Sequence, residues 1–356
     1  MNRIDAFLEL VVQQGGSDLH LVAGQPPRIR LNGNLQPVRF RELSPGDVAG
    51  LIDDIMTPAL QAKLQADWAV DFAYQAECGR FRVNAYRHTG GVAAALRVVS
   101  SKTPTLESLQ LPNVVQQTLA IPKGLILVTG PTGSGKSTTL AAMVDHINLN
   151  MKGHVITIED PIEFVHDNKQ CVITQREVGV HAPNFAEALR SAVREDPDVV
   201  LIGEMRDLET ISLALTAAET GIQVLGTLHT SGAVRCVDRI INVFPAKRQD
   251  QVRTMLADCL RLVVSQQLAR KADHSGRIAA AEVLVSTHAV SSMIRQGNTH
   301  KITSAIQAGS RVGMQSLDAV LMELVRKGII TGEEAYENAI DPGQFERYNV
   351  AGQSAA

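Results

Sequence analysis

The stretch GLILVTGPTGSGKSTTL, residues 124–140, joins an apolar run to a glycine-rich turn and then to a helical pattern. Its turn matches G-x-x-x-x-G-K-[ST], with a strand before it and a helix after it, which is the context that this motif requires. Glycines let backbone N–H groups turn toward phosphate oxygens, and the N-terminus of a helix adds partial positive charge. The stretch therefore predicts a phosphate-binding loop made of Gly130, Pro131, Thr132, Gly133, Ser134, Gly135, Lys136, Ser137 and Thr138.

The ligand that this loop predicts is ATP with Mg²⁺. We expect Lys136 to reach the β- and γ-phosphates and the hydroxyl of Ser137 to bind Mg²⁺, as these residue types do in such loops. A glycine-rich turn that binds no phosphate is the alternative, and the complete pattern in its expected context argues against it.

The chain beyond this loop alternates between strand-like and helix-like segments. Such an alternation predicts an α/β fold, in which a parallel sheet is covered by helices on both faces. The last stretch, residues 288–340, has a mostly helical pattern. The predicted strands are GLILVTG (124–130), HVITIED (154–160), DVVLIGE (198–204) and QVLGTLHT (223–230).

Acidic side chains and one histidine follow three of these strands. The carboxyl ends of neighbouring parallel strands meet at one crevice, so we expect these side chains near the phosphates. A strand of this kind usually ends in an Asp that helps to hold Mg²⁺, but Gly203 stands there, before Glu204. We expect the acids of an earlier strand to orient Mg²⁺ or water, and Glu204 to polarise the attacking water. The candidates are Glu159, Asp160, Glu163, Glu204 and His229, with Glu159, Asp160 and Glu204 also as Mg²⁺ ligands.

Two of these assignments have simpler alternatives. Glu159 and Asp160 precede a proline, and a solvated turn is the less favoured alternative for them by their local sequence. A lone histidine in a loop, such as His229, is more often structural than catalytic.

Residues 1–98 show a different rhythm and predict a separate α+β domain. Helical spacing occurs over residues 4–14, and Asn-Gly and Gly-Asn steps in residues 26–38 indicate a hairpin. Ser44-Pro45-Gly46-Asp47 predicts the start of a helix, and residues 71–99 alternate as in a small antiparallel sheet. We place a linker over 99–110, the second domain over 111–340 and a flexible tail over 341–356.

Composition excludes several classes of protein. The formal net charge of −3 and the aromatic content of 4% provide neither a basic groove nor a stacking platform, so we expect no nucleic-acid partner. No apolar run has the length of a membrane span, and the N-terminus reads as an amphipathic helix, so we expect a protein that is soluble or at most peripheral. The cysteines are scattered and suggest neither a zinc ribbon nor disulfides: Cys78, Cys171, Cys236 and Cys259.

Four segments together resemble motifs of the secretion and type IV pilus ATPases of bacteria. In that family Gly-Glu is the normal form of the strand end at residues 203–204, so Gly203 is no sign of lost activity. The resemblance implies an ATPase whose acids are relocated, and it implies site roles for Glu159 and His229. The segments are residues 130–137 (phosphate loop), ITIEDPIEF at 156–164 (aspartate box), LIGEMRDLETISLALTAAETG at 201–221 (acidic strand motif) and TLHTSGA at 227–233 (histidine box).

Within the family, the resemblance is strongest to the ATPases of pilus retraction, which drive twitching motility. It extends to GGSDLHL (15–21), PPRIRLNG (26–33) and GRFRVNAYRHTGG (79–91) in the N-terminal part. It implies a PAS-like α+β domain followed by a RecA-like P-loop ATPase domain with helical C-terminal region. It also implies a homohexamer at the inner face of the cytoplasmic membrane. The implied partners are an inner-membrane platform protein, indirectly pilin, and, as a further candidate, a second retraction ATPase.

Phosphoryl transfer needs positively charged groups next to the equatorial oxygens of the transferred phosphoryl group. The resemblance implies that arginines of the N-terminal domain supply part of this positive charge. Arg82 and Arg97 are the first candidates and Arg80 is a further one. Arg206, two residues after Glu204, has a different expected role, which is to hold the neighbouring acidic side chains in place.

One segment departs from the retraction pattern. The family helix reads close to Ala-Ile-Arg-Asn-Leu-Ile-Arg-Glu, whereas residues 289–296 read AVSSMIRQ, with Ser291 and Ser292 in place of Arg and Asn. An accessory ATP-binding ring subunit therefore stays open as an alternative, as does a pilus-extension or type II secretion ATPase. The short N-terminal region and the lack of a four-cysteine motif count against the extension and secretion alternatives.

Overall fold

The computed structural model describes residues 2–31, 33–99 and 103–348, which form two compact units. The first comprises Met1–Lys102 and Pro161–Val165, and the second comprises Thr103–Asp160 and His166–Ala356. Part of the expected linker, residues 100–102, lies outside the described residues. Leu106, in the remainder of that segment, is buried in the core of the second unit.

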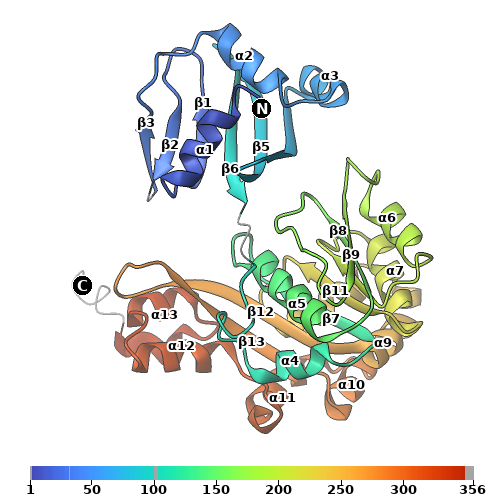
Figure 1. The fold of residues 1–356 in the computed structure, drawn as a ribbon. Coiled ribbons are helices and arrows are strands. Elements are labelled where there is room, and N and C mark those ends of the chain that lie inside the picture. The colour runs from blue at the N-terminus through green and yellow to red at the C-terminus, as the bar shows by residue number, and fades with distance from the viewer. Residues whose placement is uncertain (1, 32, 100–102, 349–356) are drawn as a thin grey trace. The chain divides into compact units, whose positions relative to one another are not determined.

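The first unit is an antiparallel six-stranded sheet in the order β3-β2-β1-β6-β5-β4, packed with three helices (Figure 1). Alternation along its strands separates two faces: Phe81, Val83 and Ala85 are buried in the core, whereas Arg80 and Arg82 belong to the other face. The sequence predictions for this part are confirmed for the first helix, the hairpin and the antiparallel sheet. The elements are α1(Asp5–Gln13), β1(Asp18–Leu21), β2(Arg28–Leu31), β3(Asn34–Pro37), α2(Pro45–Asp53), α3(Pro58–Asp67), β4(Ala69–Ala76), β5(Gly79–His88) and β6(Gly91–Val99).

Helix α2 begins where the sequence predicts, because Ser44 and Asp47 cap it reciprocally. The N–H of Asp47 donates to Ser44 Oγ at 3.2 Å, and the N–H of Ser44 donates to Asp47 Oδ2 at 2.8 Å. Two of the backbone donors that a helix start leaves unpaired are satisfied in this way.

The second unit is built on a seven-stranded sheet in the order β13-β12-β7-β11-β10-β8-β9. Every neighbouring pair from β12 to β9 is parallel, and β13 runs antiparallel to β12. The four predicted strands are confirmed as β7, β8, β10 and β11, whereas β9, β12 and β13 were not foreseen. The elements are α4(Asn113–Leu119), β7(Gly124–Thr129), α5(Lys136–Asn150), β8(His154–Glu159), β9(Val172–Glu177), α6(Phe185–Ala192), β10(Val199–Ile202), α7(Leu208–Glu219), β11(Gln223–Leu228), α8(Ala233–Asn242), α9(Ala246–Cys259), β12(Leu260–Arg270) and β13(Arg277–Val285).

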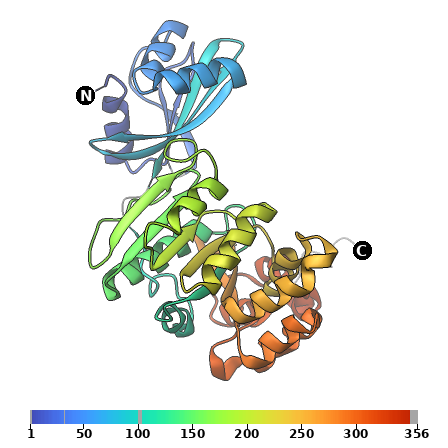
Figure 2. The ribbon, with the colours of Figure 1, turned by 90° about the vertical axis from the view of Figure 1, so that its right-hand side faces the viewer.

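Helices cover both faces of this sheet, as the alternation predicts (Figures 1 and 2). Ile126 and Val128 of β7 pack in one core with α4 and α5. Leu125 and Leu127 of the same strand pack in the other core with α6, α7, α8 and α9. Because both faces are buried, the strand is apolar along its whole length, which is why its sequence shows a continuous apolar run.

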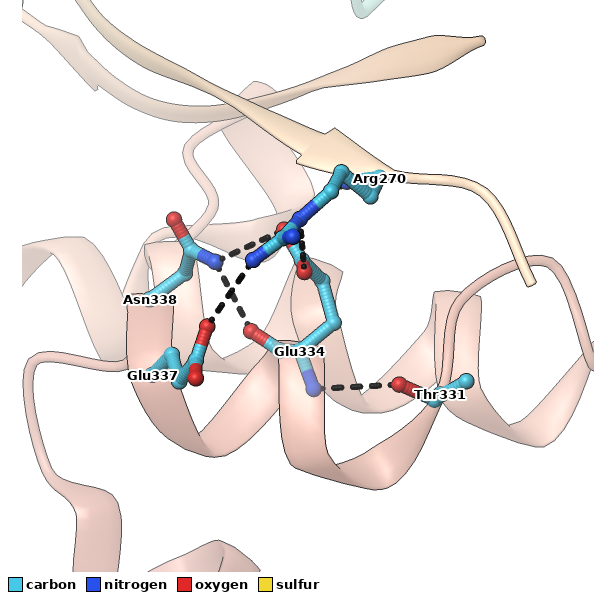
Figure 3. Close-up of polar contacts among 5 residues, drawn as sticks. All are labelled: Arg270, Thr331, Glu334, Glu337 and Asn338. Atoms are coloured by element: carbon cyan, nitrogen blue, oxygen red, sulfur yellow. Dashed lines mark hydrogen bonds and ion pairs between the residues drawn. The ribbon is translucent and has the colours of Figure 1, made fainter. Parts of the chain in front are cut away.

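The C-terminal part is helical, as predicted for residues 288–340. Helix α13 is held to the end of β12, where Glu334 accepts hydrogen bonds from the N–H of Arg270 at 2.8 Å and from its Nε at 3.0 Å (Figure 3). Asn338 donates to the same carboxylate at 3.1 Å. The elements are α10(His288–Arg295), η1(Thr299–Lys301), α11(Ile302–Ala308), η2(Ser310–Val312), α12(Leu317–Arg326), α13(Gly332–Asn338) and η3(Pro342–Tyr348).

The packed part of the chain ends later than expected. Residues Pro342–Tyr348 form η3, and Phe345 is fully buried against α12 and α13, inside the segment expected to be a flexible tail. The rest of that segment, residues 349–356, lies outside the described residues.

No helix within the described ranges is long and apolar enough to cross a membrane. The four cysteines are free thiols, as expected from their spacing. Burial raises the pKa of Cys236 and of Cys259 to about 12, so both thiols stay protonated and unreactive at neutral pH.

Candidate active site

The phosphate loop connects β7 to α5 and depends on glycines where it approaches β12. Gly130 and Gly135 have φ angles of +146° and +87°, which side-chain-bearing residues rarely adopt. A Cβ atom on Gly130 would lie 2.2 Å from the carbonyl oxygen of Gln266 and 2.7 Å from Ser134 Oγ. Glycine is therefore required here by both the backbone angle and the available space.

Two polar groups of this loop point inward. The ammonium of Lys136 is buried and donates to the carbonyl oxygens of Gly130 at 2.9 Å and Pro131 at 3.0 Å. The hydroxyl of Ser134 is buried without a hydrogen-bond partner among the described residues. An enclosed loop with an ammonium, a spare hydroxyl and a helix N-terminus behind it suits a phosphate group. Thr132 and Gly133 at the tip are exposed, and Ser137 and Thr138 form the start of α5.

The neighbouring strands β8 and β10 explain why a glycine precedes Glu204. The N–H of Gly203 donates to the carbonyl of Ile158 at 2.7 Å. A Cβ atom on Gly203 would approach the same carbonyl oxygen at 3.1 Å and Glu159 Cα at 3.3 Å. These distances are tighter than ordinary contacts, so a side chain at this position would require the backbone of β8 to shift by a few tenths of an ångström.

Glu204 lies between Arg206 and His229. Its carboxylate forms an ion pair with Arg206, and Nε2 of His229 lies 3.1 Å from the same oxygen. Burial, the largest influence, acts to raise the pKa of Glu204, but Arg206 and His229 together outweigh it and hold the pKa below its usual value. The side chain is 17% exposed. At neutral pH this carboxylate is ionised, oriented and still accessible to water.

Glu159, the last residue of β8, and Asp160, the next residue, have different partners. Thr157 Oγ1 donates to Glu159 at 2.7 Å and Gln175 Nε2 donates to it at 3.3 Å, next to Gly203. The pKa of Arg206 is raised, first by its hydrogen bond to Glu204 and also by the charge of Asp160, so Asp160 lies within electrostatic reach of the same group.

Glu163 lies in Pro161–Val165, a segment that belongs to the first compact unit. Within the described residues, the structure contains no cluster of three or more His, Cys, Asp or Glu side chains arranged to hold a metal.

The candidate arginines of the first unit lie beside one another across β5 and β6. Arg82 and Arg97 are directly paired in register. Arg97 Nε lies 2.9 Å from Asp18 Oδ1, and Arg82 Nε lies 3.9 Å from Asp71 Oδ1. The Arg97 side chain is 70% exposed and the Arg82 side chain is 43% exposed, both on the polar face of the sheet.

One residue beside the loop was missed in the sequence. Gln266 of β12 is 1% exposed and contacts the loop through both its main chain and its side chain. No sequence signal indicated it, because the strand that carries it was not predicted.

The chain is similar to known proteins over most of its length. The family described as "Type II/IV secretion system protein" matches residues 1–337. The type IV pilus retraction ATPase PilT of Pseudomonas aeruginosa is 48% identical over 343 residues, covering 96% of this chain and 99% of that protein. The type IV pilus ATPase PilU of the same organism is 40% identical, covering 94% of this chain and 88% of that protein.

A solved structure agrees with the fold. The crystal structure of the pilus retraction motor PilT with bound ADP superimposes with a TM-score of 0.91 at 42% identity, covering 98% of this chain and 99% of that one. This chain belongs to the type II/IV secretion system protein family, and within that family it is similar to the pilus retraction ATPase PilT.

Proposed function

We propose that this protein is an ATP-hydrolysing motor that drives the retraction of type IV pili. The observation that carries the proposal is the carboxylate of Glu204, held by Arg206 and His229 at the sheet edge where the phosphate loop begins. Strands β7, β11 and β10 are parallel and adjacent, so Thr129, Leu228 and Ile202 all end at that edge. The similarity to PilT supports the assignment to retraction.

The residues present fit ATP with Mg²⁺. The glycine cradle at Gly130 and the buried, unpartnered hydroxyl of Ser134 suit a phosphate. Mg²⁺ prefers oxygen ligands and usually needs only one or two from the protein, with phosphates and waters completing its shell. The hydroxyl of Ser137 and the carboxylates of Glu159, Asp160 and Glu204 would provide them. When bound, the ion neutralises charge on the phosphates.

Each residue has a distinct task in this mechanism. Lys136 binds the β- and γ-phosphates, and Glu204 orients and polarises the attacking water. His229 would hold the Glu204 carboxylate in place and respond to the γ-phosphate. Asp160 would help to hold Arg206 beside Glu204, and Glu159 would serve as a metal-orienting acid.

The roles of three further residues depend on how the two units and neighbouring subunits assemble. We propose that Arg82 and Arg97 place positive charge on the transferred phosphoryl group, which is worth about 10³–10⁵ in rate for arginines of this kind. Glu163 remains a candidate water- or metal-orienting acid. Because the side chains of Arg82 and Arg97 are accessible to solvent on the first unit, they can contact a nucleotide in an assembled ring.

The assembly that we propose is a homohexamer of two-domain subunits. A PAS-like domain over residues 1–98 joins through 99–110 to a RecA-like ATPase domain over 111–340. It works in the cytoplasm at the inner face of the cytoplasmic membrane. There it turns an inner-membrane platform protein and so withdraws pilin from the fibre.

An accessory role in a mixed ring is the second candidate. The similarity to PilU over most of both chains favours it, together with Ser291 and Ser292 in α10. In this role the protein would be a second retraction ATPase acting beside another.

Phosphate release by the purified protein tests the ATPase. Glu204→Gln should lower kcat by about 10²-fold or more, because the oriented carboxylate is lost. Glu323→Gln, which changes an exposed glutamate on α12, is the matched control and should retain wild-type turnover. Equal turnover in the two variants would refute the assigned role of Glu204.

A further inference from the structure

Strand β12 continues past the end of β7 and runs alongside the phosphate loop. Val264 and Ser265 pair with Val128 and Thr129, the last residues of β7. The next residue of β12, Gln266, therefore lies beside the loop itself. Its carbonyl oxygen occupies the space that a Cβ on Gly130 would need.

The side-chain amide of Gln266 joins two parts of the nucleotide site. Its Nε2 donates to the carbonyl oxygen of Ser134 at 2.6 Å, and its Oε1 accepts from Thr139 Oγ1 at 2.8 Å. Ser134 belongs to the loop and Thr139 to the first turn of α5. All three residues are buried. The orientation of the amide is fixed, because a carbonyl oxygen accepts only from the nitrogen end.

We propose that Gln266 is a positioning residue for the phosphate loop, which holds the loop in the conformation that binds the nucleotide. The Ser134 carbonyl and the N–H of Gly135 belong to the same planar peptide group, directly before the start of α5 at Lys136. A hydrogen bond that fixes this carbonyl therefore also fixes the direction of the Gly135 N–H. This inference rests on the proposed nucleotide site.

The expected size of the effect follows from burial. Removing the donor leaves a buried carbonyl unpaired, which destabilises this conformation of the loop. The loop then populates other conformations, and the apparent Kd rises in inverse proportion to the fraction that remains competent. A tenfold loss of competent loop would weaken binding about tenfold.

Binding of ADP to the full-length protein, well below its melting temperature, tests the proposal. We expect Gln266→Met, which keeps the volume but loses both hydrogen bonds, to raise the Kd about tenfold. Gln266→Glu retains an acceptor for Thr139 but places an oxygen against the Ser134 carbonyl, so it should bind as weakly. It also carries the test if the Met variant fails to fold.

Gln223→Met is the matched control. Gln223 is 2% exposed and its Nε2 donates to the carbonyls of Leu119 and Ile121, at the opposite end of the sheet. Its loss should lower the melting temperature and leave the Kd for ADP unchanged. Gln266 variants that lower only the melting temperature, as Gln223→Met does, would overturn the positioning role. Wild-type protein that binds no ADP would instead overturn the proposed function.

Discussion

Gly203 shows how one missing side chain is explained by backbone packing. A Cβ on Gly203 would lie 3.1 Å from Ile158 O and 3.3 Å from Glu159 Cα, so the backbone of β8 would have to shift by a few tenths of an ångström. An Asp at this position, which is common in other P-loop proteins, would therefore weaken this sheet instead of improving the site.

The corresponding prediction concerns stability. Gly203→Ala should destabilise the protein by about 1–3 kcal/mol through overpacking, and Gly203→Asp should destabilise it more. Thermal unfolding measures both, with Gly46→Ala as the control, because a Cβ on Gly46 has ample room. A Gly203→Asp variant as stable as the wild type would contradict the packing argument.

A second prediction concerns Arg206 and the pH dependence of kcat/KM. In Arg206→Gln, burial remains the largest influence on Glu204 while its strongest opposing partner is gone, so the pKa of Glu204 rises. The carboxylate then takes up a proton at higher pH. We expect the acidic limb of the kcat/KM profile to move to higher pH in this variant. An unchanged limb would show that another group controls it.

Some candidate site residues can be predicted from the sequence because their chemistry lies in a local pattern. Lys136 and Ser137 follow from the loop motif, and Glu204 follows from its place at a strand end. Gln266 could not be found, because its role comes from residues more than a hundred positions away. The pairing of His229 with Glu204 was also not foreseen, since it depends on the order of β11 and β10 in the sheet.

At the scale of elements, the N-terminus of helix α8 is hydrogen-bonded to the buried carboxylate of Glu282. The N–H of Ala233 donates to Glu282 Oε1 at 2.7 Å. Burial raises the pKa of Glu282, the hydrogen bond from Ala233 opposes the rise and Asp318 adds to it. The folded state thus holds this proton more tightly than the unfolded chain. Its stabilising contribution is complete below the unfolded pKa and is lost as pH rises through the folded pKa.

Glu282→Gln tests that sign. The amide keeps an acceptor for Ala233 and removes the cost of a buried charge, so the melting temperature at about pH 7.5 should rise, by roughly 2–4 °C for each kcal/mol gained. The gain should disappear near pH 4, where the wild-type carboxyl is protonated. A less stable variant at pH 7.5 would mean that the N-terminus of α8 stabilises the ionised form.

Helix α10 carries the departure from the retraction pattern. Val290 and Ile294 are buried, so the helix keeps its packing, and the hydroxyl of Ser291 lies 3.2 Å from that of Ser286. We expect Ser291→Arg with Ser292→Asn to leave ATP turnover within about twofold and to reduce pilus number in cells. Unchanged pilus number would show that those side chains are not what retraction requires.

The strands that the sequence did not reveal have identifiable causes. β9 is an edge strand with few apolar residues, and Val172 at its start is 58% exposed. β12 carries buried Ser265 and Gln266 in its middle, which interrupts the apolar run. β13 is rich in alanine, which favours helix by local propensity. In each case sheet pairing and tertiary packing decided the structure.

At the scale of the whole molecule, the two units have different surfaces and different tasks. The second unit contains the phosphate loop and the acidic edge, and the first presents the exposed arginine pair Arg82–Arg97. Both kinds of group are needed for rapid phosphoryl transfer. We therefore propose that ATP turnover is a property of the assembled ring, and we expect that isolated units do not hydrolyse ATP.

The most direct test of the central claim is the number of surface pili on cells that lack this gene, complemented with either the wild type or Glu204→Gln. If the protein is a retraction motor, cells without the gene should carry excess pili, and only the wild type should return the pilus number to normal. Correction by both versions would contradict a motor that depends on its own turnover, and bald cells would show that it extends pili.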